Sequence, residues 1–273
     1  MQDIECIAFL QRVLPRMKLR WPGFRKVHSQ VCKRIARRLD ALDLSDIPAY
    51  LRYLREHPFE WQILDSLCRV TITRFYRDKH VFGLLQQVYL PELAKRILLQ
   101  GGNTLKVWSA GCASGEEPYS INLVWQLALA SRFPGISLRV LATDADANLL
   151  QRAQEACYAY GSIKNLPSMC RDRGFEHADD RYCLRREFCS AVEFRRQDVR
   201  AMIPEGPFHL VLCRNLVFTY FDTDLQQRFL QGLQRVISQE GLLLLGVHER
   251  LPGSEHGFIA CSARWGFYRP GVG

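Results

Sequence analysis

The stretch LKVWSAGCASGEEPYS, residues Leu105–Ser120, decides the fold. A short apolar run enters a turn of small residues, and a helix start follows, which is typical of a buried strand joined to a helix. Gly111 and Gly115 allow the backbone of this turn to come close to a ligand. The turn lacks the GK[ST] of a phosphate loop. Glu116 and Glu117 would repel a pyrophosphate, so the turn suits a cationic ligand instead.

Three later runs repeat this form: ISLRVLATD from Ile136, FHLVLCRN from Phe208 and GLLLLGVHE from Gly241. Between the runs lie stretches with helical spacing, namely PYSINLVWQLALA, ANLLQRAQEA and TDLQQRFLQGLQRVI. Strands that alternate with helices predict βαβ units and a mainly parallel sheet. Because such sheets bind ligands at the carboxyl ends of their strands, we expect the chemistry in the turn after each strand.

The region before these runs, residues 1 to about 90, has the pattern of helices. Apolar residues recur every four positions within Phe24–Leu39, at Val27, Val31, Ile35 and Leu39. Ser45 is the predicted N-cap of the helix IPAYLRYLREH, and a further helix is predicted over Glu60–Arg69.

The charge of this helical region is strongly basic. Between Arg12 and Arg38 there are ten Lys or Arg residues and no Asp or Glu, in a chain of net charge +9. Such a field favours an anionic partner, whether a nucleic acid, a membrane surface or an acidic protein, although a merely solvated helix face fits as well. The candidate docking residues are Lys26, Lys33, Arg34, Arg37 and Arg38.

Composition excludes several classes of protein. With 48% hydrophobic and 24% charged residues the chain can bury a core, so disorder is not expected. No apolar run approaches the roughly 20 residues that span a bilayer, so we expect no membrane insertion. The start MQDIECIAFLQ is acidic where a signal peptide is basic, which predicts a cytoplasmic location. Ten cysteines without a CxxC pair predict no metal site, and in a reducing compartment they are expected as core or strand residues.

Acidic residues follow two of the predicted strands. Asp144 ends ISLRVLATD, where a carboxylate can accept hydrogen bonds from both hydroxyls of an adenosine ribose. Asp146 or Asn148 is expected to cap the next helix. In VEFRRQDVR, Asp198 and Val199 are predicted to end a strand, where Asp198 would hold an adenine amino group and Val199 would pack on the ring. With the glutamates of the first turn, these residues favour S-adenosylmethionine as the ligand.

Polar and aromatic residues follow the predicted strand in FHLVLCRN. Arg214 and Asn215 directly follow the buried run of FHLVLCRN, where polar side chains are costly unless they are functional or well paired. Tyr220 and Phe221 could line a methyl-transfer pocket or serve only in packing.

Six motifs occur in the order seen in the CheR-type chemoreceptor glutamate methyltransferases, which the chain resembles over about residues 5–250: TITRFYRD, WSAGCASGEEPYS, ATDAD, FHLVLCRN, YFD and GLLLLGVHE. The resemblance implies an α/β fold with a Rossmann-like class I methyltransferase sheet, an all-helical N-terminal domain and a small β-subdomain near Tyr158–Phe194. It implies a substrate-docking domain over residues 1–70, a linker and connecting helix over 71–104, and an S-adenosylmethionine-binding domain over 105–273.

The resemblance also implies the activity and its residues. A methyl group would pass from S-adenosylmethionine, leaving S-adenosylhomocysteine, to glutamate carboxylates of an acidic helical protein, a chemoreceptor. Arg77 and Tyr220 are the implied catalytic residues nearest the reacting methyl. The implied cofactor contacts are Thr71, Thr73, Arg77, Gly111, Glu117, Asp144, Asp198, Val199, Arg214 and Asn215. The chain departs from the family at Thr71, where Asn is usual, and in one extra residue between CRN and YFD.

A glutamate acceptor needs no general base, because its carboxyl group, with a pKa of about 4.3, is already ionised at neutral pH. Three other functions stay open. A nucleic-acid methyltransferase would fit the basic charge, but the chain has CRNL in place of a [DN]PP[YFW] loop, and no cysteine follows Pro or Thr. The others are a regulator that binds the cofactor without turnover and an enzyme that methylates a small carboxylic acid.

Overall fold

The chain folds into two compact units in the structure, a computed structural model that describes residues 3–253 and 256–271. Unit 1 comprises the residues up to Ile72 together with Leu216–Gln226. Unit 2 comprises Thr73–Asn215 and the residues from Gln227 onward. The sequence patterns indicated the helical start of the chain, but not that a later segment belongs with it.

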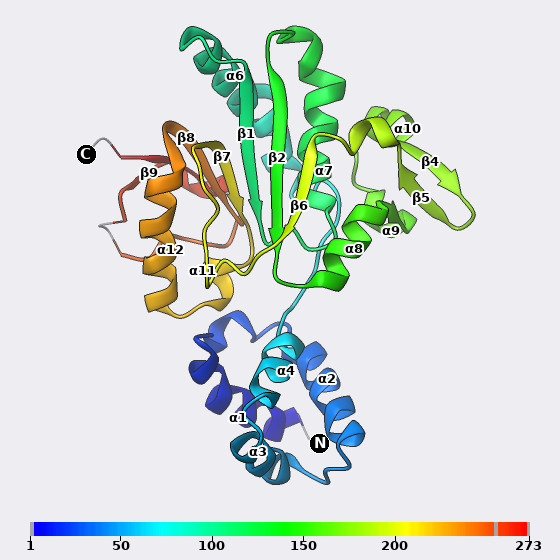
Figure 1. The fold of residues 1–273 in the computed structure, drawn as a ribbon, viewed down its shortest axis with the longest axis vertical. Helices are drawn as coiled ribbons and strands as arrows, with labels where there is room; N and C mark the ends of the chain where they lie inside the picture. Colours follow the sequence, from blue (N-terminus) through cyan, green and yellow to red (C-terminus); the bar gives the residue numbers. More distant parts are fainter. Residues whose placement is uncertain (1–2, 254–255, 272–273) are drawn as a thin grey trace. The chain divides into compact units, whose positions relative to one another are not determined.

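Unit 1 is helical (Figure 1). Its helices are α1 (Asp3–Val13), α2 (His28–Ala41), α3 (Ile47–Glu56), α4 (Glu60–Leu67) and the short α11 (Val217–Tyr220). Each long helix buries one apolar face, and the rings of Phe9 on α1 and Tyr50 on α3 pack 5.7 Å apart in the core. No helix within residues 3–253 and 256–271 is long and apolar enough to cross a membrane.

Three local predictions for this unit need correction. Helix α2 begins at His28, so Val27 precedes it and is only half-buried, whereas Val31, Ile35 and Leu39 are buried on one face as predicted. Helix α3 is capped by Asp46 and not by Ser45, because the Asp46 carboxylate accepts a hydrogen bond of 2.7 Å from the Ala49 N–H. Helix α4 ends at Leu67, two residues before the predicted end.

Unit 2 is built on a mainly parallel sheet. Its seven strands within the described residues have the order β6-β2-β1-β7-β8-β10-β9, of which the first five are parallel. Strand β10 pairs antiparallel with both β8 and β9. The strands are β1 (Thr104–Ala110), β2 (Ser137–Asp144), β6 (Val192–Arg196), β7 (Phe208–Cys213), β8 (Ile237–Leu245), β9 (Phe258–Ser262) and β10 (Phe267–Pro270). The predicted Rossmann-like α/β class is confirmed.

Helices cover both faces of this sheet, which explains why its central strands are apolar throughout. They are α5 (Lys79–Leu84), α6 (Leu90–Leu99), α7 (Glu116–Val124), α8 (Ala147–Glu155) and α12 (Thr223–Val236). Along β1 the side chains alternate between faces. Leu105 and Val107 belong to the cluster that contains α6 and α7, whereas Trp108 contacts Phe229 of α12 at a ring distance of 6.0 Å. Because β1, β2, β7 and β8 run parallel, their carboxyl ends meet at one edge of the sheet.

A small antiparallel sheet stands where the resemblance implies a β-subdomain. Its order is β3-β5-β4. The strands are β3 (Cys157–Tyr158), β4 (Phe175–Ala178) and β5 (Arg181–Leu184), with the short helices α9 (Tyr160–Ile163) and α10 (Ser168–Gly174) between β3 and β4.

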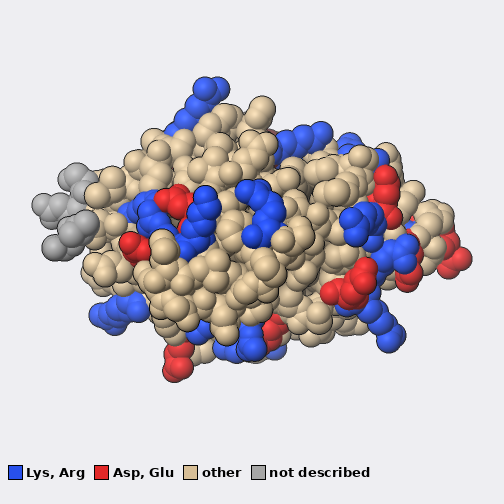
Figure 2. Space-filling view, turned by 90° about the horizontal axis from the view of Figure 1, so that it is seen from above, with Lys and Arg blue, Asp and Glu red and all other residues tan. Residues whose placement is uncertain are grey.

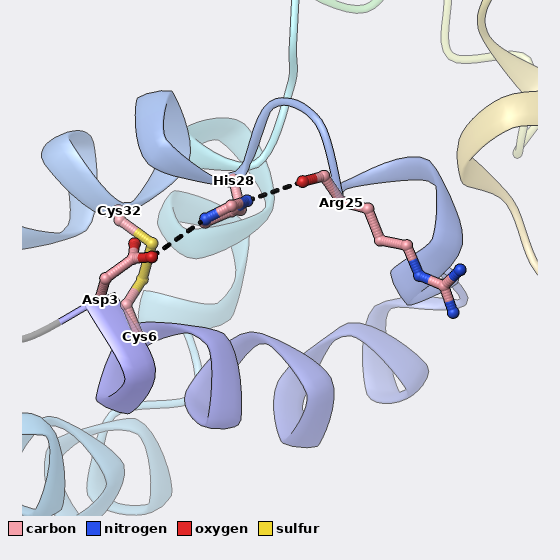
Figure 3. Close-up of a disulfide and its surroundings, with 5 residues drawn as sticks. All are labelled: Asp3, Cys6, Arg25, His28 and Cys32. Atoms are coloured by element: carbon pink, nitrogen blue, oxygen red, sulfur yellow. Dashed lines mark hydrogen bonds and ion pairs between the residues drawn. A yellow bond between two sulfur atoms is a disulfide. The ribbon is translucent and has the colours of Figure 1, made fainter.

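Four of the ten cysteines lie in the core or in strands as expected, but they also form disulfides, which the sequence did not indicate. Cys6–Cys32 joins α1 to α2, close to the contact between Asp3 and His28 (Figure 3). Cys157–Cys183 joins β3 to β5, whose register places these two residues opposite each other. Each pair is 26 residues apart in sequence, so only helix packing and strand pairing reveal it.

Candidate functional site

The glycine turn after β1 is held against the end of β2. The N–H groups of Gly111 and Cys112 both donate to the Thr143 carbonyl, at 2.8 and 3.0 Å. Gly115 has a left-handed φ of 89° and directly precedes α7. A Cβ at Gly115 would lie 3.0 Å from Ala153 and 3.2 Å from Phe194, so only glycine allows this close approach. The turn is therefore fixed at the edge where parallel sheets bind ligands.

Asp144 connects this turn with the one after β2. Its Oδ2 accepts a hydrogen bond of 2.9 Å from the Ala113 N–H, and its Oδ1 accepts one of 2.9 Å from the Asp146 N–H. Asp146 caps α8 by accepting from the N–H groups of Asn148 and Leu149, which decides between the two predicted caps. The carboxylate of Asp144 thus stands at the predicted strand end, and its contact with a ribose stays a prediction.

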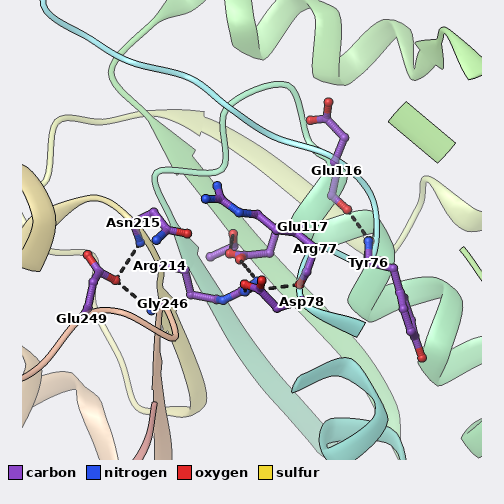
Figure 4. A network of polar contacts seen from close by, with 11 residues as sticks. Tyr76, Arg77, Asp78, Glu116, Glu117, Arg214, Asn215, Gly246 and Glu249 are labelled. Atoms are coloured by element: carbon purple, nitrogen blue, oxygen red, sulfur yellow. Dashed lines mark hydrogen bonds and ion pairs between the residues drawn. The ribbon is translucent and has the colours of Figure 1, made fainter. Parts of the chain in front are cut away.

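Arg214 forms the centre of a buried ionic network after β7 (Figure 4). Its side chain is 3% exposed, and it donates to Glu117 Oε2 at 3.2 Å and to Asp78 Oδ2 at 2.5 Å. It also donates to the Arg77 carbonyl at 3.2 Å. Ser109 on β1 donates to the other oxygen of Glu117 at 2.8 Å. The network joins the ends of β7 and β1, the start of α7 and the TITRFYRD segment, but Arg214 Nε has no hydrogen-bond partner among the described residues.

The TITRFYRD segment has no regular secondary structure near this network. Tyr76 and Asp78 have left-handed φ values of 55° and 64°, and the Tyr76 N–H donates to Ser120 Oγ at 3.0 Å. The segment therefore bends sharply on both sides of Arg77. Figure 4 shows the guanidinium group of Arg77 lying apart from that of Arg214.

Glu116 has a different role from the one the sequence suggests. It is 3% exposed, and its carboxylate accepts hydrogen bonds from Ser114 Oγ at 2.9 Å and Ser162 Oγ at 3.2 Å. Thr73, a predicted cofactor contact, also hydrogen-bonds to it. Burial raises the pKa of the Glu116 carboxyl, and these hydrogen bonds oppose the rise. Glu116 therefore joins three segments, and it does not present an open negative charge to a cation.

Asp198 and Val199 follow β6 instead of ending it. The strand ends at Arg196, and the Gln197 N–H makes the next bond to β2, at the Asp144 carbonyl. Asp198 pairs with the guanidinium group of Arg200 at 2.7 Å, a partner that the sequence reading missed. Val199 is buried, and the predicted adenine contacts of both residues stay predictions.

Glu249 is a buried residue at the same edge that sequence reasoning missed. It is 3% exposed, and its Oε2 accepts hydrogen bonds of 2.7 Å from the N–H groups of both Asn215 and Gly246 (Figure 4). An acidic residue four positions after the apolar run of β8 was the available signal. No group of three or more His, Cys, Asp or Glu that could hold a metal ion occurs within the described ranges.

Two of the residues predicted to lie near the cofactor, Thr71 and Tyr220, belong to unit 1. Thr71 is exposed. Tyr220 lies at the end of α11, where its ring packs edge-on against Phe24 at 5.1 Å and its carbonyl accepts a hydrogen bond of 2.8 Å from the Arg20 N–H. Their predicted contacts near the cofactor stay predictions.

The five basic residues predicted to dock a substrate divide into two groups. Lys26, Lys33 and Arg37 are exposed. Arg34 donates to the carbonyls of Leu67 and Arg69, at 3.1 and 2.5 Å, and Arg38 binds both oxygens of Glu60, at 2.9 and 2.7 Å. Arg34 and Arg38 thus support the fold of unit 1.

Comparison with known families identifies this arrangement. Residues 71–267 match the family described as CheR methyltransferase, SAM binding domain. The chain belongs to the CheR methyltransferase family. It is therefore an S-adenosylmethionine-dependent methyltransferase, and the turns described above fit that cofactor: acidic residues follow β2 and β6, and glycines let the backbone after β1 come close.

Relatives match over most of the chain. The chemotaxis protein methyltransferase of Escherichia coli K12 is 32% identical over 84% of this chain and 78% of its own length. Chemotaxis protein methyltransferase 2 of Pseudomonas aeruginosa is 30% identical over 83% of this chain and 80% of its own. An uncharacterised 104.1 kDa protein of Rhodobacter capsulatus is 30% identical over 89% of this chain, which spans only 25% of that protein.

Proposed function

We propose that the chain methylates glutamate carboxylates on the helical cytoplasmic part of chemoreceptors and so forms glutamyl methyl esters. The observation that carries the proposal is the similarity to chemotaxis protein methyltransferases, at 30–32% identity over about four fifths of their lengths. A cytoplasmic location is part of the same proposal.

The reaction needs alignment more than acid–base chemistry. A carboxylate oxygen of the acceptor forms a bond to the methyl carbon, the bond from that carbon to sulfur breaks, and its electron pair stays on the sulfur of S-adenosylhomocysteine. The acceptor carboxyl has a pKa of about 4.3 and has already lost its proton at neutral pH. Correct alignment of the three reacting atoms can contribute on the order of 7–11 kcal/mol in favourable models.

Arg77 is the proposed group that orients the acceptor carboxylate. A guanidinium group can donate two parallel hydrogen bonds to one carboxylate, which fixes its plane as well as its position. The turns at Tyr76 and Asp78, with φ of 55° and 64°, set the backbone on both sides of it. The methyl-proximal role of Tyr220 stays a prediction from the resemblance.

The exposed basic side chains on α2 and just before it are the proposed docking surface for the acceptor helix, although the sequence pattern places Lys26 on the helix itself. Lys26, Lys33 and Arg37 are exposed, and the structure gives none of them an ion pair among the described residues. A helix that carries several glutamates has the complementary charge.

The proposal is tested with radiolabelled S-adenosylmethionine and a purified cytoplasmic receptor fragment. We expect label that alkali releases as methanol, because esters hydrolyse and N-methyl or C-methyl products do not. Arg77→Ala should lower turnover far more than the affinity for S-adenosylhomocysteine, and Arg77→Lys should restore only part of it. Arg74→Ala, at an exposed position of the same segment, is the matched control. Alkali-stable label, or wild-type turnover of Arg77→Ala at saturating acceptor, would contradict the proposal.

Nucleic acid is the second candidate acceptor, because the basic field of α2 would also attract phosphates. Figure 2 shows one other face, seen from above Figure 1, on which Lys and Arg side chains lie apart, between uncharged residues and beside Asp and Glu. A receptor fragment and an RNA, offered together to the protein with S-adenosylmethionine, compete as methyl acceptors. Methyl transfer to RNA, with none to the receptor fragment, would favour the second candidate.

A further inference from the structure

Two of the strand-end turns in unit 2 are tied together by a single carboxylate oxygen. Asn215 lies in the turn after β7, directly after Arg214, and Gly246 begins the turn after β8. Both N–H groups donate to Oε2 of Glu249 at 2.7 Å. The Glu249 N–H donates back to the Gly246 carbonyl at 2.9 Å, so the glutamate is anchored through its backbone as well. Glu249 thus fixes the spacing of the two turns.

The tie acts on an unusual backbone conformation. Asn215 has a φ of 56°, in the left-handed region of backbone conformation. Asn adopts this region more readily than most residues do, but the conformation is still unfavourable. Its side chain also packs directly on the next turn, because a Cβ added to Gly246 would lie 2.5 Å from Asn215 Nδ2. The bond to Glu249 fixes the Asn215 backbone, and the absence of a side chain at Gly246 leaves room for the Asn215 amide.

The side-chain oxygen of Asn215 lacks a hydrogen-bond partner within the described part of the chain, although it is buried. A buried acceptor without a partner is costly, and a donor from a bound molecule removes that cost. This oxygen stands at the carboxyl end of β7, at the edge where parallel sheets bind their ligands.

We propose that Glu249 is a positioning residue of the S-adenosylmethionine site, which holds Asn215 so that its side-chain amide meets the cofactor. The inference rests on the cofactor that the family shows and on Asn215 as a cofactor contact, and it does not depend on which acceptor is methylated. Glu249 acts through the turn, and it need not touch the cofactor. A glutamate suits the task because one of its side-chain oxygens can accept both hydrogen bonds.

Three variants of the full chain test this role, with titration of S-adenosylhomocysteine by calorimetry. Glu249→Ala should weaken binding by about tenfold or more, since both N–H groups lose their acceptor. Glu249→Gln should stay within about threefold of the wild type, because its amide oxygen can accept the same two bonds. Glu240→Ala, at an exposed glutamate of the same strand β8, is the control and should not change the affinity.

A double-mutant cycle separates positioning from general loss of stability. Asn215→Gly removes the side chain but keeps the left-handed turn accessible. If Glu249 acts through Asn215, adding Glu249→Ala to Asn215→Gly should produce little further loss of affinity. Unfolding is followed in parallel by circular dichroism, and only variants that are folded at the titration temperature are compared.

Two results would overturn the inference. One is wild-type affinity of Glu249→Ala for S-adenosylhomocysteine. The other is a loss of affinity that adds in full to that of Asn215→Gly, since the two residues would then act independently. If Glu249→Ala does not fold, Glu249→Asp takes its place in the titration and in the cycle, because the shorter side chain cannot reach both N–H groups in the same geometry. Failure of receptor methylation would leave these titrations unaffected.

Discussion

Arg38 in unit 1 and Arg214 in unit 2 each bind a carboxylate that is largely buried. The two networks differ in how many of their polar groups have hydrogen-bond partners. In unit 1, Arg38 binds both oxygens of Glu60, and the Tyr50 hydroxyl donates to the same carboxylate at 2.8 Å. In unit 2, Arg214 divides its donors between two carboxylates and a carbonyl. Its Nε, and the neighbouring Asn215 Oδ1, are buried without partners among the described residues.

The difference separates a structural network from one built for a ligand. The Arg38 network lies between helices, where each buried polar group must be paired inside the protein. The Arg214 network lies at the carboxyl ends of parallel strands, where a bound cofactor can complete the pairing. Incomplete pairing at that edge is therefore a better sign of the site than the presence of charge alone.

Removal of Arg214 should have the largest effect. Arg214→Ala leaves Glu117 and Asp78 without their cation, and the side chain of Glu117 is only 16% exposed. Loss of one partner of a buried pair costs on the order of 3 kcal/mol or more of folding free energy. We also expect affinity for S-adenosylhomocysteine to fall by more than about tenfold. Calorimetry and denaturant unfolding measure the two effects.

Arg214→Lys sharpens this test. One ammonium group keeps the charge but cannot reach two carboxylates and a carbonyl in the same geometry. The variant should therefore recover stability better than cofactor affinity. Equal recovery of both would mean that the network serves the fold alone, like that of Arg38.

Disruption of the first network should show the opposite balance. Glu60→Ala leaves the Tyr50 hydroxyl, which is completely buried, and Arg38 without their shared acceptor. We expect a loss of about 2–4 kcal/mol in folding free energy, from the unpaired buried groups. Affinity for S-adenosylhomocysteine should stay within about twofold of the wild type, a smaller change than the loss of one hydrogen bond would cause. A fall in affinity as large as that of Arg214→Ala would remove the distinction between the networks.

The contributions of Glu60 in unit 1 and Glu116 in unit 2 to folding stability should change with pH in opposite directions. Burial acts to raise the pKa of Glu60, but hydrogen bonds from Arg38 and Tyr50 outweigh it and hold the pKa below the usual value of 4.5. Its stabilising contribution is complete above pH 4.5 and is lost as the pH falls through the lowered pKa. Burial raises the pKa of Glu116 above 4.5, so its contribution is present below that pH and is lost as the pH rises through the raised pKa.

Unfolding of Glu60→Gln and Glu116→Gln between about pH 3 and pH 7 measures both signs, since glutamine does not titrate in this range. Relative to the wild type, Glu60→Gln should lose less stability on acidification. Glu116→Gln should lose less stability as the pH rises from 4.5. The same slope change in both variants would contradict the assignment.

Much of unit 2 could be predicted because each element has a local signal. The apolar runs of β1, β2, β7 and β8 and the helices between them follow from periodicity, and the rule for parallel sheets points to their carboxyl ends. These signals placed Asp144 and Arg214 correctly at strand ends.

Pairing between distant residues could not be predicted in the same way. The sequence shows Glu117 beside a glycine turn, but not that it binds Arg214, 97 positions later. Glu249 and the disulfide partners Cys6 and Cys32 are likewise joined only by packing. Periodicity also could not show that Arg38 binds Glu60, whereas Arg37 on the same helix is exposed.

The smallest expected effect concerns the exposed residues of that helix. Charge reversal at Lys33 and Arg37 should raise the apparent KM for a receptor fragment by about threefold to tenfold at low salt, because exposed charges contribute modestly and mainly to encounter. Folding stability should change by less than about 0.5 kcal/mol, as is usual for surface substitutions. Affinity for S-adenosylhomocysteine should not change.

Two controls make this effect specific to the docking surface. Arg52→Glu with Arg55→Glu makes the same charge change at exposed positions of α3 in the same unit. If α2 docks the acceptor, only the Lys33 and Arg37 reversal should raise KM. The difference should shrink between 50 mM and 500 mM salt, as the Debye length falls from about 14 Å to about 4 Å. Equal effects of both reversals would mean that net charge alone steers the acceptor, and α2 would then be no more than the solvated face of a helix.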